Sequence, residues 1–155
     1  MIKQEQVLKL FNDGYCCAAI TFGVCAEKLG LDFDTAVRIP AAYGYGIGHG
    51  NTCGAVTGGI MALGLKYGND TYGDIPTKEA FGRIRQEYEK AFIEKNGCLL
   101  CKELLGRNPE IPEELAYLRA HDVSRKKCPT IVANACAILE RMLDIELDAK
   151  GGHDE

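Results

Sequence analysis

The chain has 155 residues, of which 46% are hydrophobic and 26% charged; this suits one domain with its own core and is too short for two ordinary domains. Its formal net charge of −4 provides no basic field, so we expect neither nucleic acid nor an anionic membrane surface as a partner. The N-terminal sequence MIKQEQVLKLF is too charged for the apolar region of a signal peptide, and we expect a cytoplasmic protein.

The longest stretch without a fixed charge lies between Arg38 and Lys66, and its length would suffice to cross a bilayer. It contains Pro40 and eight glycines, together with polar residues near position 50. It therefore lacks the continuous apolar run of a membrane helix, and we expect buried protein interior and no membrane insertion.

The first third of the chain predicts three helices. Apolar residues recur at helical spacing over residues 2–11, which indicates a short amphipathic helix. Residues 15–29 are apolar on nearly every side, which is typical of a helix in the centre of a fold. Asp32 and Asp34 are suited to cap a short helix that Pro40 interrupts.

A glycine-rich loop over residues 43–50 follows, with glycine at every second position. Asn51 or Thr52 is expected to cap the next helix, which covers residues 53–67 and stops at Gly68. Small residues give this helix a face on which another helix can pack closely: Gly54, Ala55, Gly58, Gly59 and Ala62.

The second half of the chain predicts four more helices. Thr77 is expected to cap the first of them. Pro129 is expected at the first helical position of the last one, because proline is favoured there. The four helices cover residues 78–95, 98–106, 113–121 and 128–143.

No segment alternates as a strand does, so the predicted fold class is all-α. We expect a compact bundle of four to six helices with the glycine-rich loop leading into a central helix. A single α-helical domain covers residues 1–148, and residues 149–155 form a frayed tail.

The eight cysteines are the most informative feature, because structural disulfides are rare in a reducing cytosol and thiols there more often bind metal or carry out redox chemistry. At a helix start, exposed N–H groups and the helix dipole favour the thiolate. Cys25 and Cys136 lie inside predicted helices and are expected to pack in the core. The others lie at or near predicted helix starts: Cys16, Cys17, Cys53, Cys98, Cys101 and Cys128.

Several thiolates that converge from helix starts would suit zinc or an iron–sulfur cluster, and the spacings do not choose between them. Cys98 and Cys101 form a single CxxC pair without a second one, which is a weak zinc signal. The same pair would suit a redox dithiol, but the strand and helix of a thioredoxin-like site are missing. His49, four residues before Cys53, is either a ligand or a loop histidine bonded to the backbone.

Two other cofactor classes are excluded by their spacing. The glycine-rich loop does not follow G-x-G-x-x-G, and no Gly-Lys-Ser/Thr follows it, so it is not a phosphate loop. Lys102 stands where a CxxCH haem-attachment sequence requires histidine. No general base can be placed beside a thiol, so the sequence leaves enzymatic activity open.

Four segments together resemble a known family: GYCCAAI (14–20), CGAVTG (53–58), CKELLG (101–106) and the pair Cys128-Pro129. The family is described as redox-active and named for its C_GCAxxG_C_C pattern. The resemblance covers residues 11–143 and implies an iron–sulfur cluster. It implies four characteristic cysteines, with Cys16 and Cys98 as departures that would substitute for a neighbour; the four are Cys17, Cys53, Cys101 and Cys128.

Three functions follow from these observations. The first is an electron-transfer or redox-sensing protein whose four characteristic cysteines bind an iron–sulfur cluster of the 2Fe–2S type. The second is a metal-free thiol–disulfide protein that cycles a pair such as Cys53 and Cys101. The third is a structural zinc-binding domain. The sequence does not identify the redox partner protein, and a small exposed apolar face would allow a homodimer.

Overall fold

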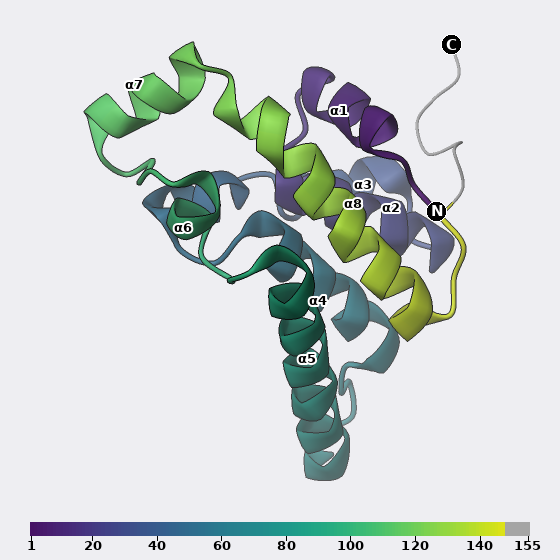
Figure 1. Cartoon of the computed structure of the whole chain (residues 1–155). Coiled ribbons are helices and arrows are strands. Elements are labelled where there is room, and N and C mark those ends of the chain that lie inside the picture. Colours follow the sequence, from purple (N-terminus) through teal and green to yellow (C-terminus); the bar gives the residue numbers. More distant parts are fainter. Residues whose placement is uncertain (148–155) are drawn as a thin grey trace.

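The computed structural model describes residues 1–147 (Figure 1). Residue 148 and the predicted tail over residues 149–155 lie outside the described part. The described residues form eight α-helices and one π-helical turn, with no strand, so the predicted all-α class is confirmed. The elements are α1 (Gln4–Asn12), α2 (Cys17–Lys28), α3 (Phe33–Arg38), η1 (Gly46–Gly50), α4 (Gly54–Tyr67), α5 (Ile75–Asn96), α6 (Cys101–Leu105), α7 (Pro112–Ala120) and α8 (Val123–Leu143).

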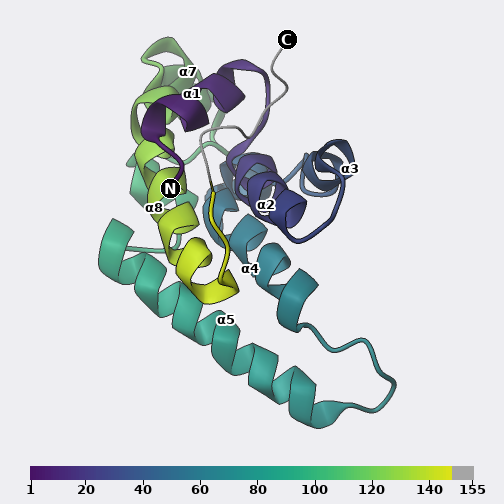
Figure 2. The ribbon, with the colours of Figure 1, turned by 90° about the vertical axis from the view of Figure 1, so that its right-hand side faces the viewer.

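Five helices form the bundle, in agreement with the prediction of four to six. Helix α8 packs against α1, α2, α4 and α5, and α2 packs along α4 (Figures 1 and 2). Helix α3 lies on the outer side of α2, and the short helices α6 and α7 lie beyond the N-terminal half of α8 (Figure 1). Fully buried side chains from these helices form the main core, among them Val56, Leu63, Phe92, Val132 and Leu139.

The close contact between α2 and α4 depends on two glycines. A Cβ atom added at Gly54 would overlap the Sγ atom of Cys17, and one added at Gly58 would meet the carbonyl oxygen of Ala18 at 2.5 Å. Only glycine leaves room for the backbone of α2 at these two positions. The predicted small face of the central helix is therefore used for helix packing.

Two helix starts differ from the prediction. Helix α4 has neither Asn51 nor Thr52 as its N-cap residue, because it starts at Gly54 and the carbonyl of Cys53 accepts the first N–H groups of the helix. Thr52 pairs with Leu100 in an isolated β-bridge. Helix α5 begins at Ile75, because the carboxylate of Asp74, and not Thr77, caps it by accepting a hydrogen bond from the Thr77 N–H group at 3.1 Å.

The predicted start of the last helix at Cys128 is also wrong. Helix α8 begins at Val123, directly after Asp122, whose φ of 53° is left-handed. Pro129 therefore lies inside the helix, where its ring removes one backbone N–H donor. The polar segment that precedes Cys128 continues the helix for more than one turn toward the N-terminus.

Within residues 1–147, none of the helices combines the length and the apolar character that a membrane span requires. The cytoplasmic location, the homodimer and the single domain stay predictions.

Candidate functional site

Five of the eight cysteines line one pocket with a volume of about 300 Å³. The pocket lies between the N-terminal ends of α2 and α4, the short helix α6 and the first half of α8. Apolar side chains from α1, α6 and α8 complete much of its wall. The cysteines are Cys16, Cys17, Cys53, Cys101 and Cys128.

A short backbone pairing brings Cys53 and Cys101 to the pocket. The N–H group of Cys53 donates to the Leu99 carbonyl at 2.8 Å, and the N–H group of Cys101 donates to the Asn51 carbonyl at 2.7 Å. These bonds connect the residues before α4 to the residues before α6. The two cysteines are therefore fixed relative to each other although they lie 48 positions apart in the sequence.

The first turn of α2 supplies two more thiols. The thiol of Cys17 lies over Gly54, is hydrogen-bonded to the thiol of Cys53, and accepts backbone N–H bonds from Ala18 and Gly54. The Sγ atom of Cys16 lies 3.5 Å from the carbonyl oxygen of Pro40. Cys17 is thus in direct contact with Cys53, whereas Cys16 is oriented toward the loop after α3.

Cys128 lies in the second turn of α8 and lines the pocket. It packs against a small second hydrophobic core, whose buried members are Cys101, Leu105 and Leu118. The second core joins α6 and α7 to the start of α8. This part of the molecule therefore holds two of the five pocket thiols.

Burial and contacts between the thiols override the expected effect of the helix starts on the pKa values of the cysteines. The hydrogen bond with Cys53, followed by burial, raises the pKa of the Cys17 thiol well above its ordinary value. Burial and the nearby Cys17 raise the pKa of Cys101 to about 12. Burial, Cys17 and Cys101 raise the pKa of Cys128, and burial raises the pKa of Cys16. The expectation of thiolates at these positions is wrong for the metal-free protein.

The other two residues predicted as substitutes do not line the pocket. Cys98 lies in the segment between α5 and α6 and is partly buried. His49, in η1, has an exposed side chain whose Nδ1 atom lies 3.0 Å from a carboxylate oxygen of Glu110. The structure thus brings together the four characteristic cysteines and Cys16, and leaves Cys98 and His49 outside.

A second pair of cysteines lies in the main core, as the sequence predicts. Cys25 and Cys136 are both fully buried, and their thiols are hydrogen-bonded to each other. This hydrogen bond, followed by burial, raises the pKa of Cys25 well above its ordinary value. The pair lies apart from the pocket that the other five cysteines line.

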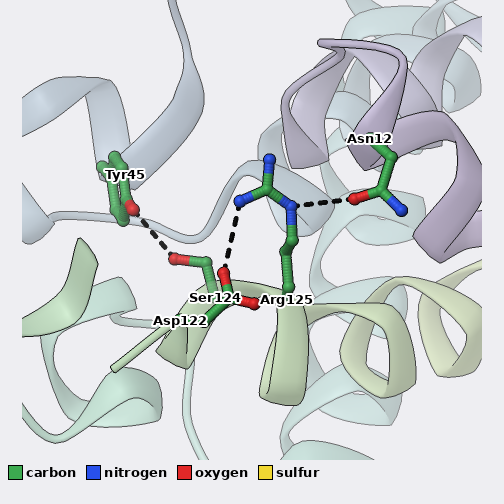
Figure 3. A network of polar contacts seen from close by, with 5 residues as sticks. All are labelled: Asn12, Tyr45, Asp122, Ser124 and Arg125. Atoms are coloured by element: carbon green, nitrogen blue, oxygen red, sulfur yellow. Dashed lines mark hydrogen bonds and ion pairs between the residues drawn. The ribbon is translucent and has the colours of Figure 1, made fainter. Parts of the chain in front are cut away.

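A polar rim of the pocket was not predicted from the sequence. The hydroxyl of Ser124 donates to the hydroxyl of Tyr45 at 2.9 Å, and Arg125 donates to Asn12 and Asp122 (Figure 3). Tyr45, Ser124 and Arg125 all line the pocket. Because α8 begins at Val123, Ser124 and Arg125 lie one helical turn before Cys128 on the same face. The predicted helix start at Cys128 left this relation out.

Among residues 1–147, no three His, Cys, Asp or Glu side chains are grouped closely enough to hold one metal ion. Three thiols on a single zinc ion at about 2.3 Å would lie roughly 3.8 Å from one another. In the described part of the chain, the pocket thiols are therefore not arranged as the ligand set of one metal ion.

The fold and the pocket define the chain as an all-α, cysteine-rich protein. The particular family follows from comparison: the family model described as "Putative redox-active protein (C_GCAxxG_C_C)" matches residues 15–142. The chain belongs to this redox-active family, and the resemblance noted in the sequence is confirmed. No curated protein and no solved structure matches the chain.

Proposed function

We propose that this protein binds an iron–sulfur cluster of the 2Fe–2S type through four cysteines and serves in electron transfer or redox sensing. The ligands are Cys17, Cys53, Cys101 and Cys128. The observation that carries the proposal is that thiols from four separate segments of the chain line one pocket. The bound cluster would supply a one-electron carrier.

The donor set fits such a group. Cysteine thiolates are the usual ligands of iron–sulfur clusters, and backbone N–H groups that bond to their sulfurs help to set the reduction potential. The sulfur of Cys17 already accepts N–H bonds from Ala18 and Gly54.

A second candidate function rests on the contact between Cys17 and Cys53. Their hydrogen-bonded thiols are a pair that a metal-free thiol–disulfide cycle could use. Oxidation would join the two sulfurs and transfer two electrons and two protons to the disulfide of a partner, which leaves as a dithiol. The predicted pair Cys53 and Cys101 stays an alternative, because both residues also line the pocket.

The test is anaerobic purification and reconstitution with ferrous iron and sulfide, followed by visible absorption, iron and acid-labile sulfide analysis. We expect the native chain to bind both, and Cys53→Ser to lose most of the bound iron. Cys98→Ser is the matched control, because Cys98 does not line the pocket, and it should retain the cluster. Cys16→Ser should also retain it if the four characteristic cysteines are the ligands.

Other outcomes identify the alternatives. One equivalent of zinc without sulfide would support the structural zinc site. Metal-free protein with a reversible disulfide between Cys17 and Cys53, mapped by mass spectrometry, would support the thiol–disulfide function. Equal iron content in the Cys53→Ser and Cys98→Ser variants would overturn the proposed ligand set.

A further inference from the structure

We infer that the cysteine-lined pocket also binds a small organic carboxylate, whose charged group is held at the rim by Arg125 with the hydroxyls of Ser124 and Tyr45. Among the described residues that line the pocket, Arg125 is the one with a charged side chain. A pocket with a single positive charge beside two hydroxyls favours an anionic ligand.

Arg125 has donors left for such a ligand. Its Nε atom donates to Asn12 at 2.9 Å, and its Nη1 atom donates to Asp122 at 3.2 Å. Figure 3 shows the third nitrogen, Nη2, turned away from both partners. A guanidinium group carries five N–H donors in a planar fork that matches a carboxylate. The ion pair with Asp122 is half-exposed on both sides, so it holds the guanidinium only weakly.

The rest of the pocket sets the ligand's size and body. Phe11, Tyr15 and Ile131 line the pocket, so the wall beyond the rim is largely apolar. A volume of about 300 Å³ is at the small end of ligand pockets. The ligand class is therefore a small carboxylic acid with an apolar body that extends from the rim toward the cysteines.

The carboxylate and the proposed cluster share this pocket but depend on different residues. Binding of the anion rests on the rim, which contains no proposed cluster ligand. A role of the anion in electron transfer rests on the proposed function. The two ideas can therefore fail separately.

Iodoacetate and iodoacetamide test whether the pocket prefers an anion. Both reagents alkylate thiols in the same way, but iodoacetate is negatively charged and iodoacetamide is neutral. The full-length reduced protein is treated with each reagent without metal, and the modification rate of each cysteine is measured by mass spectrometry. Dividing the two rates at one thiol removes the influence of its pKa. Cys128, one turn from Arg125, and Cys16 are the reporters. Cys98 is the internal control outside the pocket.

We expect the ratio of iodoacetate to iodoacetamide rates to be about fivefold higher at Cys128 than at Cys98, as for one charge near contact distance in water. Arg125→Gln should abolish this excess. Lys126→Gln should preserve it, because Lys126 does not line the pocket. Lys127 is unsuitable as the control, because its charge acts on the Cys128 thiol. An unchanged iodoacetamide rate at Cys128 would show that the variant keeps the pocket intact.

A protection experiment tests the apolar body of the ligand. Benzoate should slow the iodoacetamide reaction of Cys128 and leave Cys98 unaffected, and benzamide should protect much less. Equal charge ratios at Cys128 and Cys98, or equal protection by the two ring compounds, would overturn the inference. Failure of both reporters to react would also overturn it, because the pocket would then be closed to small solutes. None of these results depends on cluster formation.

Discussion

Replacement of Gly58 by alanine tests whether the glycines of the central helix are there for packing. In an open helix position, this change stabilises by about 1 kcal/mol, because alanine is the better helix former. At Gly58, however, the new Cβ atom would lie 2.5 Å from the carbonyl oxygen of Ala18 and 3.1 Å from its Cα atom. Both are backbone atoms of α2, which cannot rotate away as a side chain would.

Overpacking of this kind costs up to about 3 kcal/mol. After the gain in helix propensity, we expect the free energy of unfolding to fall by about 2 kcal/mol, and for a chain of this length the Tm to fall by about 4–8 °C. The matched control is Gly82→Ala in α5, where an added Cβ atom meets nothing within 4 Å. Its Tm should rise by about 2–4 °C.

Thermal unfolding of the reduced, metal-free proteins, followed by circular dichroism, measures both variants. A Tm of Gly58→Ala equal to or above that of the native chain would refute the packing argument. A fall of similar size in Gly82→Ala would do the same, because the loss would then not depend on the contact with α2.

Three further predictions use the same protein. Tyr88→Phe should lower the free energy of unfolding in urea by about 1 kcal/mol, because the buried hydroxyl donates to the Ala55 carbonyl at 2.7 Å; an unchanged value would show that this bond contributes nothing. The pKa of Cys101 is raised in the folded state from 9.0 to about 12, so its contribution to stability is complete below pH 9 and decreases as the pH rises toward 12. Cys101→Ala should flatten this decrease in urea titrations, and an equally steep decrease would assign it to other groups. Cys25 and Cys136 should resist iodoacetamide in the native protein and react only after unfolding, since both are fully buried; rapid modification of either would contradict the packing of the core.

The existence of the helices could be predicted because their apolar periodicity is strong, whereas their first residues could not. The cap of α4 was assigned to Asn51 or Thr52 from residue preference, but the helix has Cys53 at its N-cap and Thr52 pairs with Leu100. This pairing joins residues 48 positions apart, from 52 to 100, and no local pattern encodes it. Pro129 was placed at a helix start, where proline is favoured, although the tertiary structure continues α8 past it.

One part of the candidate site could be predicted from the sequence and another could not. The four characteristic cysteines could be chosen because each belongs to one of the short motifs whose order resembles the family pattern. The rim could not be found, because Tyr45, Ser124 and Arg125 belong to no motif and meet only after folding. Their approach depends on the left-handed backbone of Tyr45, at φ 55°, and on the N-terminal turn of α8, which precedes the predicted helix start at Cys128.

The acidity of the thiols shows why a helix start is insufficient evidence for a thiolate. Dipoles and N–H groups at the start of α2 act on Cys17, and the N–H bonds from Ala18 and Gly54 do lower its pKa. The same packing that brings Cys17 to Cys53 also buries it and supplies a second sulfur, and these two effects are larger. Cys17, Cys101 and Cys128 therefore hold their protons in the metal-free protein, and binding of the proposed cluster would release them. The helix bundle positions the thiols, and under the proposed function the positive charge that favours their thiolate forms would come from the iron of the cluster.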